Sequence, residues 1–373
     1  MPDSPLSICL INRNYPPQRG ATGYFASHFI KAVKSQTSHD VHVVTLGKSK
    51  SNKEITYVSP VYDGKKKILR LLSAYRESEL LIKAAERRSP DVFIVMTDPA
   101  LLNYWASKRL KDKTWVYWSM DLFPEGFKAN ELIAAQSFAY KRYQSVLKGG
   151  NPSYLLGLGD EQLDYIRSQY YPHTEGAWLP IGLREGIEQI GTFISGPSEK
   201  ITVGYVGNVG EAHDPGLIAD CLLAFEQRGF NVMLRCYGTG AEDLLHRVDG
   251  SAIKTFNHVS EEQLRAIDIH LVSLRKEWTH ICVPSKALSA LQGGNTVLFL
   301  GSKHSDTWQM SKTAGWLVDD PLKLTHVIDT IDRVSLDKKK KAAQSAVLDL
   351  RANYNTGLSS FFTFLEKIKT RKT

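Results

Sequence analysis

The sequence predicts an α/β protein of two doubly wound domains, each a parallel sheet with helices on both faces. Short runs rich in β-branched and aromatic residues alternate with longer segments of helical periodicity, which is typical of parallel α/β layers. The alternation breaks once, in residues 174–200, where glycines and prolines cluster, and then restarts. With 373 residues, the chain is also long enough to form two cores.

In the first half, four apolar runs are predicted strands: Ser7–Ile11, Val41–Leu46, Val92–Thr97 and Trp115–Trp118. Between the first two, apolar residues recur at helical spacing at Phe25, Phe29 and Val33. In the second half, the predicted strands are Ile201–Val206, Val232–Tyr237, Ile269–Ser273 and Thr296–Leu300. The stretch from Leu336 to the end carries no strand pattern and is predicted to be helical. The predicted domains are 1–178 and 179–345, followed by a helix at 346–373.

The composition indicates a globular protein, with 42% hydrophobic and 23% charged residues. No apolar run approaches the roughly 18–20 residues of a membrane-spanning helix, and the start of the chain lacks the pattern of a secretory signal, so we expect a cytoplasmic protein. The four cysteines are scattered among aliphatic residues and suggest neither disulfides nor a zinc site. A net charge of +8 favours an anionic partner.

Ligands of an open parallel sheet gather beyond the carboxyl ends of its strands, so the strand-to-helix loops carry the functional prediction. The first such loop, NRNYPPQRGATGYF, is stiffened by Pro16 and Pro17, and Gly20 and Gly23 allow close approach of a ligand. An ordinary turn, in which the glycines only satisfy the backbone, is the alternative.

The second loop, GYVGNVGEAHDPGLI, has glycines at 207 and 210 on either side of Asn208, whose side chain could bind a phosphate or a sugar hydroxyl. Asp214 is the expected N-cap of the following helix, with a proline after it. The pattern is not the dinucleotide-binding GxGxxG, so a nicotinamide enzyme is disfavoured. The third loop, YGTG, either faces a base or ribose through Gly238 or is a tight turn.

The fourth loop, VPSKALSALQGG, places Ser285 as the expected N-cap and Lys286 in the first turn of a helix. A lysine there opposes the helix dipole, and an anion such as a diphosphate would resolve the conflict. Arg275, at the end of the preceding strand, is close enough in sequence to share the site. A solvated lysine and an exposed loop arginine are the alternatives.

In this order and spacing, these segments resemble the GT-B glycosyltransferases of the GT4 type, particularly the bacterial surface-polysaccharide branch. The resemblance rests on YPPQRGATGYFASHFIKAV, MDLFPE, GYVGNVGEAHD, YGTGAEDLL, VSEEQLRAIDIHLVSL and VPSKALSALQGGNTVLF, and covers nearly the whole chain. It implies two Rossmann-like domains facing across a cleft, with the C-terminal helix returning to the first domain. It also implies transfer of a sugar from a nucleotide diphosphate, expected to be UDP, to a glycan or lipid-linked acceptor, with retention and without metal or cofactor.

The resemblance assigns Asp121, Lys286 and Arg275 to catalysis, and Asp121 and Glu125 to the acceptor. Asp121 could instead cap the segment that follows it, and Glu125 could lie on the surface. The residues expected to bind the donor are Gly20, Gly23, Asn208, Gly210, His213, Gly238, Pro284, Ser285, Lys286 and Ser289. The chain also departs from the family. Many GT4 enzymes carry a Glu-x7-Glu signature, whose two places are taken here by Ile281 and Ser289, and His213 stands in a loop where relatives carry Arg and Lys.

Residues 65–88 join basic side chains, including Lys65, Lys66, Lys67 and Arg70, to a leucine-rich face. This pattern fits a helix lying on an anionic membrane surface, and it fits equally well a core-packed helix with a solvated basic face.

Two other functions remain open: a nucleotide-sugar epimerase on the same scaffold, and an inactive nucleotide-sugar-binding partner subunit, which the missing carboxylates would explain. Nucleic-acid binding is disfavoured because the sequence offers no reading motif or aromatic platform.

Overall fold

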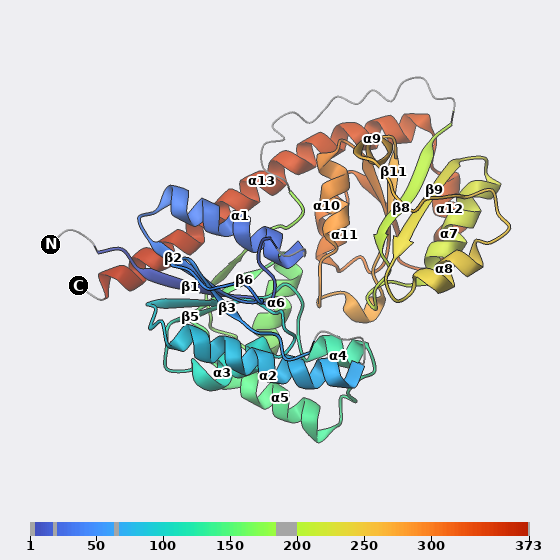
Figure 1. Cartoon of the computed structure of the whole chain (residues 1–373). Coiled ribbons are helices and arrows are strands. Elements are labelled where there is room, and N and C mark those ends of the chain that lie inside the picture. Colours follow the sequence, from blue (N-terminus) through green and yellow to red (C-terminus); the bar gives the residue numbers. More distant parts are fainter. Residues whose placement is uncertain (1–3, 18–20, 63–66, 184–199, 372–373) are drawn as a thin grey trace. The chain divides into compact units, whose positions relative to one another are not determined.

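The computed structural model describes residues 4–17, 21–62, 67–183 and 200–371 (Figure 1). Its contacts divide the chain into two compact units, Met1–Leu179 with Asn355–Thr373, and Pro180–Tyr354. The last part of the chain therefore belongs to the first unit, as expected for the C-terminal helix.

The first unit contains a seven-stranded sheet in the order β3-β2-β1-β4-β5-β6-β7, and its paired strands are parallel. The strands are β1 (Ser7–Ile11), β2 (Asp40–Leu46), β3 (Ile55–Val58), β4 (Val92–Val95), β5 (Trp115–Trp118), β6 (Tyr154–Gly157) and β7 (Gly176–Trp178). All four residues of β4, β5 and β6 are buried, as expected for strands covered on both faces.

Helices cover both faces of this sheet (Figure 1). Those that join its strands are α1 (Ala21–Gln36), α2 (Lys67–Glu86), α3 (Leu102–Arg109), α4 (Glu125–Ala129), α5 (Phe138–Lys148) and α6 (Asp160–Gln169). In Figure 1, α2, α3 and α5 lie together on one face, and α1 lies on the other beside the end of α13 (Arg333–Thr370). Aromatic contacts fix α13 there, since Phe361 lies 5.3 Å from Phe29 and Phe364 stacks 4.6 Å from Tyr154, measured between ring centres.

The second unit contains a six-stranded sheet in the order β10-β9-β8-β11-β12-β13, also with parallel pairs. The strands are β8 (Thr202–Asn208), β9 (Asn231–Tyr237), β10 (Lys254–Thr255), β11 (Ile269–Ser273), β12 (Thr296–Leu300) and β13 (Gly315–Val318). The helices are α7 (Pro215–Gln227), α8 (Ala241–Arg247), α9 (Glu261–Arg265), α10 (Ser285–Gln292), α11 (Asp306–Ser311) and α12 (Leu324–Asp329). In Figure 1, α7, α8 and α12 lie on one side of the sheet, and α10 and α11 on the other.

The predicted fold class is confirmed, and each of the eight predicted strands is present within about two residues at either end. Five strands were not predicted: β3, β6, β7, β10 and β13. Four of these, β3, β7, β10 and β13, are the edge strands of the two sheets, where sequences need not be strongly apolar. β6 is an internal strand whose short run YLLG was overlooked.

Two helix boundaries bear on the site. Asp214 caps α7 as predicted, its carboxylate accepting the backbone N–H of Leu217 at 3.1 Å. The expected cap at Ser285 is wrong by one residue: α10 begins at Ser285 and Pro284 occupies the N-cap position without a side-chain hydrogen bond. Lys286 lies in the first turn, as expected. In the described part of the chain, no helix is long and apolar enough to cross a membrane.

Candidate functional site

The second sheet reverses its strand order at β8 and β11, which are neighbours. From β8 the chain continues into α7 on one side of the sheet, and from β11 into α10 on the other. Such a switch point leaves a crevice outside the carboxyl ends of the strands, where open α/β sheets bind their ligands. The loops that follow β8 and β11 are therefore the first place to look for a site.

Lys286 places a cation at this switch point. Its Nζ donates hydrogen bonds to the hydroxyl of Tyr205, at 2.9 Å, and to the carbonyl oxygen of Asn208, at 3.1 Å. The same Nζ lies 4.3 Å from the centre of the Tyr205 ring. Burial lowers the pKa of the amine to about 7, because a desolvated ammonium loses its hydration. An anion at this position would restore the charged form.

Two glycines shape the surroundings of Lys286. At Gly207, φ is +148°, and a Cβ atom would lie 3.1–3.4 Å from the lysine side chain, which crosses the end of β8 there. At Gly238, φ is +101°, and a Cβ atom would lie 2.0 Å from Oδ1 of Asn208. A larger residue at 238 would displace the Asn208 side chain, so the second and third loops are packed against each other.

His213 ties the loop after β8 to the end of β11. Its Nδ1 lies 2.6 Å from the carbonyl oxygen of Ser273, and the backbone N–H of Arg275 donates to the carbonyl of Ala212 at 2.8 Å. Burial, with the nearby charge of Lys286, lowers the pKa of His213 to about 3, so the ring is neutral near pH 7 and Nδ1–H donates. His213 therefore holds the loops together as a neutral group. The Arg275 side chain is exposed.

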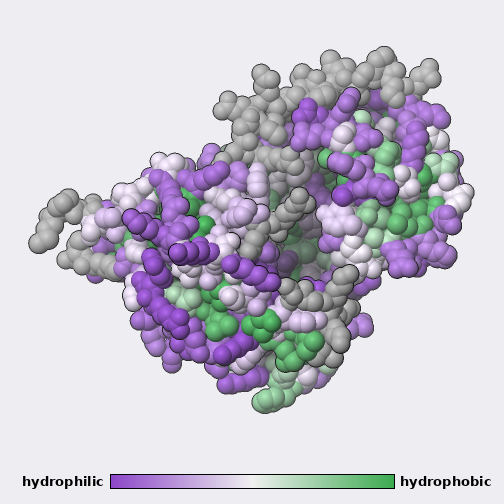
Figure 2. All heavy atoms as spheres, in the orientation of Figure 1, coloured by the Kyte–Doolittle hydropathy of each residue, from purple (hydrophilic) through white to green (hydrophobic). Residues whose placement is uncertain are grey.

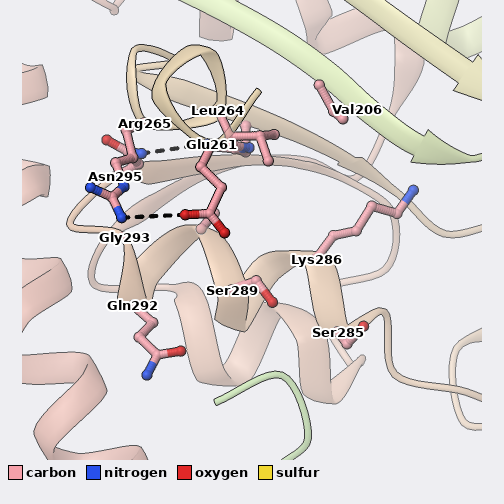
Figure 3. Close-up of a pocket in the computed structure, with 12 residues that line it drawn as sticks. Val206, Glu261, Leu264, Arg265, Ser285, Lys286, Ser289, Gln292, Gly293 and Asn295 are labelled. Carbon is pink, nitrogen blue, oxygen red and sulfur yellow. Dashed lines mark hydrogen bonds and ion pairs between the residues drawn. The ribbon is translucent and has the colours of Figure 1, made fainter. Parts of the chain in front are cut away.

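A pocket of about 250 Å³ runs along α10 from Lys286 (Figure 3). Its lining residues are Val206, Glu261, Leu264, Arg265, His270, Ser285, Lys286, Ser289, Ala290, Gln292, Gly293 and Asn295. Three of the predicted donor-binding residues, Ser285, Lys286 and Ser289, are thus brought together. The other five predicted residues of this unit do not line it: Asn208 ends β8, Gly210, His213 and Gly238 lie in the loops after β8 and β9, and Pro284 is the N-cap of α10.

One wall of the pocket is polar, and of the residues that form it the sequence predicted only Ser289. Glu261 and Arg265, on successive turns of α9, form an ion pair with their nitrogen and oxygen 3.6 Å apart. Ser289, on α10, is exposed and donates its hydroxyl hydrogen to the carbonyl of Gly182 at 3.1 Å. A surface charge on a short helix carries no local pattern, so sequence could not have identified Glu261 as a pocket residue.

In the first unit, two carboxylates follow neighbouring strands. Asp98 comes three residues after β4 and Asp121 three residues after β5. The Thr97 hydroxyl fixes them side by side, because it accepts the backbone N–H groups of Met120, at 3.1 Å, and Asp121, at 3.0 Å. Burial raises the pKa of both carboxyls to about 6, and the charge of Asp98 adds to the shift of Asp121.

Asp98 was missed by the sequence analysis, although an acidic residue at the carboxyl end of a predicted strand was a usable signal. Its carboxylate accepts a hydrogen bond from Nδ2 of Asn14 at 2.9 Å, and Nε of Arg13 lies 3.8 Å from its other oxygen. The first loop of the chain therefore contacts this carboxylate directly. Asp121 does not cap α4, whose N-cap is Pro124.

Other predicted residues of the first unit have structural partners. A Cβ atom on Gly23 would lie 2.7 Å from the carbonyl oxygen of Asn14, so the close approach there is to the chain's own backbone. Glu125 is 4% exposed and accepts a hydrogen bond from the hydroxyl of Tyr170, so the alternative of a surface glutamate is wrong. Gly20 lies outside the described residues.

Helix α2 agrees with parts of both interpretations given to residues 65–88. Its first half leaves Leu69, Leu72 and Tyr75 41%, 62% and 43% exposed. Its second half is packed in the core, with Leu81 and Ile82 buried. Figure 2 shows apolar surface over α2 and α5. Lys65 and Lys66 lie outside the described residues, as does the side chain of Lys67.

No family model matches the chain, and no curated protein does. Solved structures do resemble it. Sucrose-phosphate synthase from Thermosynechococcus elongatus has a TM-score of 0.71 at 12% identity, over 97% of this chain and 100% of that one. An E. coli trehalose-6-phosphate structure with bound UDP-2-fluoro glucose has a TM-score of 0.66 at 12% identity, over 97% and 99%. WaaG, a glycosyltransferase of lipopolysaccharide biosynthesis, has a TM-score of 0.60 at 14% identity, over 94% and 95%.

These likenesses cover nearly the full length of each chain, and they show the fold. The protein has a GT-B fold. Among the described residues, no group of three or more His, Cys, Asp or Glu side chains could hold a metal ion.

Proposed function

We propose that the protein is a glycosyltransferase that moves a sugar from a nucleoside diphosphate to a hydroxyl group of an acceptor. The observation that carries the proposal is Lys286, a desolvated amine in the first turn of α10, at the switch point of the sheet and in the lining of a pocket. An anion that binds there gains the charge of the lysine and the amide groups at the helix start.

The donor is proposed to be a UDP-sugar, as in the similar E. coli structure that holds UDP-2-fluoro glucose. In the reaction, the bond between the anomeric carbon and the diphosphate breaks, and a bond to the acceptor oxygen forms. Negative charge grows on the leaving diphosphate, so a cation placed there stabilises the transition state more than the ground state. Lys286 is proposed in this role, with Arg275 as a second cation from the same loops.

Asp121 is proposed to hold the acceptor hydroxyl and its proton. A carboxyl whose pKa is raised to about 6 is close to the range in which a general base works at neutral pH. Asp98 beside it would tune that pKa and could receive a second hydrogen bond from the acceptor. We propose that Glu125 stabilises the structure around this site and does not touch the acceptor, because its carboxylate is buried and accepts a hydrogen bond from Tyr170.

The finer assignment is to the GT4 type, with a glycan or lipid-linked acceptor, retention of anomeric configuration, and no requirement for a metal or cofactor. It is supported by the order of the sequence segments that resemble that family. A lipid-linked acceptor would place the protein at the cytoplasmic face of a membrane. The exposed leucines of α2, beside Arg70 and Arg76, would serve as the contact surface.

The deciding experiment is to incubate the purified protein with nucleotide sugars and to follow nucleoside diphosphate release with and without candidate acceptors. A transferase releases it in step with acceptor glycosylation. Turnover of the nucleotide sugar without any acceptor would indicate the epimerase or hydrolase alternative. Donor binding without turnover would indicate an inactive partner subunit, a result favoured by Ile281 and Ser289 in place of the signature carboxylates.

A further inference from the structure

Two oxygen atoms at the end of β8 hold the amine of Lys286. The hydroxyl of Tyr205 donates a hydrogen bond to the carbonyl oxygen of Asn208 at 2.8 Å. The Lys286 Nζ donates to both of these oxygens, at 2.9 Å to the hydroxyl and at 3.1 Å to the carbonyl. An ammonium group has three N–H donors, so this arrangement uses two of them and leaves one for a ligand.

The Tyr205 hydroxyl serves Lys286 as an acceptor. Its own hydrogen is directed at Asn208, and burial raises the pKa of the phenol above its ordinary value, so the hydrogen stays in place. A hydrogen bond from a charged donor is stronger than one from a neutral donor, so this oxygen favours the ammonium over the neutral amine. The centre of the same ring lies 4.3 Å from Nζ, and its π face also attracts a cation. Tyr205 therefore offsets part of the penalty that burial places on the charge.

Tyr205 is fixed by the core, whereas Lys286 has a long and flexible side chain. The tyrosine ring is fully buried in the hydrophobic core of the second unit. The lysine side chain crosses the end of β8 at Gly207, where a Cβ atom would lie 3.1 Å from its Cδ. Figure 3 shows it directed away from Ser289 and Gln292. A rigid residue thus determines where a flexible cation is placed.

We propose that Tyr205 is a positioning residue of the donor site, whose hydroxyl oxygen holds the charged amine of Lys286 in place for an oxygen of the donor diphosphate. This inference rests on the proposed function and deepens it. Tyr205 acts through Lys286, which presents its remaining N–H to the diphosphate. The diphosphate then meets a cation that is already oriented, so less side-chain order has to be gained when it binds.

The test is Tyr205→Phe, which removes the hydroxyl and keeps the ring, in calorimetric titrations of the full chain with UDP between pH 5.5 and pH 8. The ammonium loses an acceptor, so the pKa of Lys286 should fall from about 7 by about half a unit to one unit. At pH 5.5, where both proteins carry the charge, the two affinities should differ least. At pH 8 the affinity of the variant, relative to the unaltered protein, should be about threefold to tenfold lower than at pH 5.5.

The matched control is Tyr237→Phe, which removes a hydroxyl from the neighbouring strand β9, where the tyrosine is 52% exposed. Its affinity relative to the unaltered protein should not change with pH. Such ratios also cancel the titration of UDP itself. The other titratable groups that act on the Lys286 amine are His213 and Cys282. Burial lowers the pKa of His213 to about 3, so its ring is neutral throughout, and Cys282 is present in all three proteins.

The outcomes separate two failures. If the unaltered protein binds UDP but the relative affinity of Tyr205→Phe is the same at pH 5.5 and pH 8, Tyr205 does not hold the charge of Lys286 and the donor site stands. An equal change in Tyr237→Phe would also overturn the assignment of Tyr205. If GDP or ADP binds in place of UDP, the same comparison is made with that nucleotide. If the folded protein binds none of the three at either pH, the donor site itself is refuted.

Discussion

Binding of a nucleoside diphosphate should depend on pH through Lys286. Burial lowers the pKa of this amine to about 7 in the free protein, so at pH 8 only about a tenth of the molecules carry the ammonium. A bound diphosphate favours the charged form, so binding above pH 7 requires uptake of a proton. Affinity for UDP should therefore fall by about tenfold per pH unit above pH 7, and should level off below pH 6.5.

The substitution Lys286→Met tests this prediction, because methionine keeps an apolar side chain of similar length and removes the charge. Loss of a charge-assisted hydrogen bond should weaken UDP binding by about tenfold to a hundredfold at pH 6.5, and the variant should lose the slope above pH 7. Any pH dependence that remains in the affinity of the variant for UDP then reports the titration of UDP alone. Calorimetric titration in two buffers of different ionisation enthalpy counts the protons taken up when UDP binds. At pH 8 the unaltered protein should take up nearly one proton more than the Lys286→Met variant.

The same substitution separates binding from folding. The pKa of Lys286 lies below that of an unfolded lysine, so between about pH 7 and pH 10 the unfolded chain binds more protons than the folded one. The burial penalty is therefore complete below pH 7 and disappears as pH rises through that window. Lys286→Met should leave Tm at pH 7 unchanged or raised. The role of Lys286 would be refuted if UDP affinity did not depend on pH between 6.5 and 8.5, or if the unaltered protein and Lys286→Met bound UDP equally well.

Three further predictions use activity, stability and membrane contact as readouts. Asp121→Asn should lower kcat by about a hundredfold or more, because the proposed general base is lost. UDP affinity and Tm at pH 7 should not fall, since burial raises the pKa of this carboxyl and its charge does not stabilise the fold. An unchanged kcat would exclude Asp121 as the base. Gly238→Ala should destabilise the protein by about 1–3 kcal/mol in urea titration, since φ is +101° and the new Cβ would meet Asn208; no loss would contradict the loop packing. Leu72→Glu should reduce sedimentation with anionic vesicles, whereas the control Leu348→Glu, at a leucine 59% exposed on α13, should not; equal binding by both variants would exclude α2 as the contact.

The strands that the sequence predicted are mostly those buried on both faces, although the buried strand β6 was overlooked. Runs such as VFIV of β4 and WVYW of β5 are fully buried, and their apolar character is continuous. The edge strand β3 has four half-buried residues, and β10 has two exposed ones, so neither carries a strong apolar pattern. Edge strands are defined by their neighbours in space, which a local pattern does not contain.

The candidate site was partly predictable for the same reason. Lys286 was found because its position conflicts with the helix dipole, which is a local property. Asp98 follows a predicted strand directly, but the residues around it include no glycine, so its loop lacked the signal that marked the other loops. The environment of Glu125 depends on Tyr170, 45 residues later in the chain, and the role of His213 depends on Ser273, 60 residues later. Such partners are set by the fold, so sequence alone could not distinguish a buried structural group from a ligand contact.

The donor site at Lys286 is the central claim, and the most direct test is calorimetric titration of the protein with UDP, GDP and ADP, each with and without a chelator. We expect one of the three, UDP, to bind in preference to the others and equally well with the chelator present. A folded sample that binds none of them would show that Lys286 does not form a donor site.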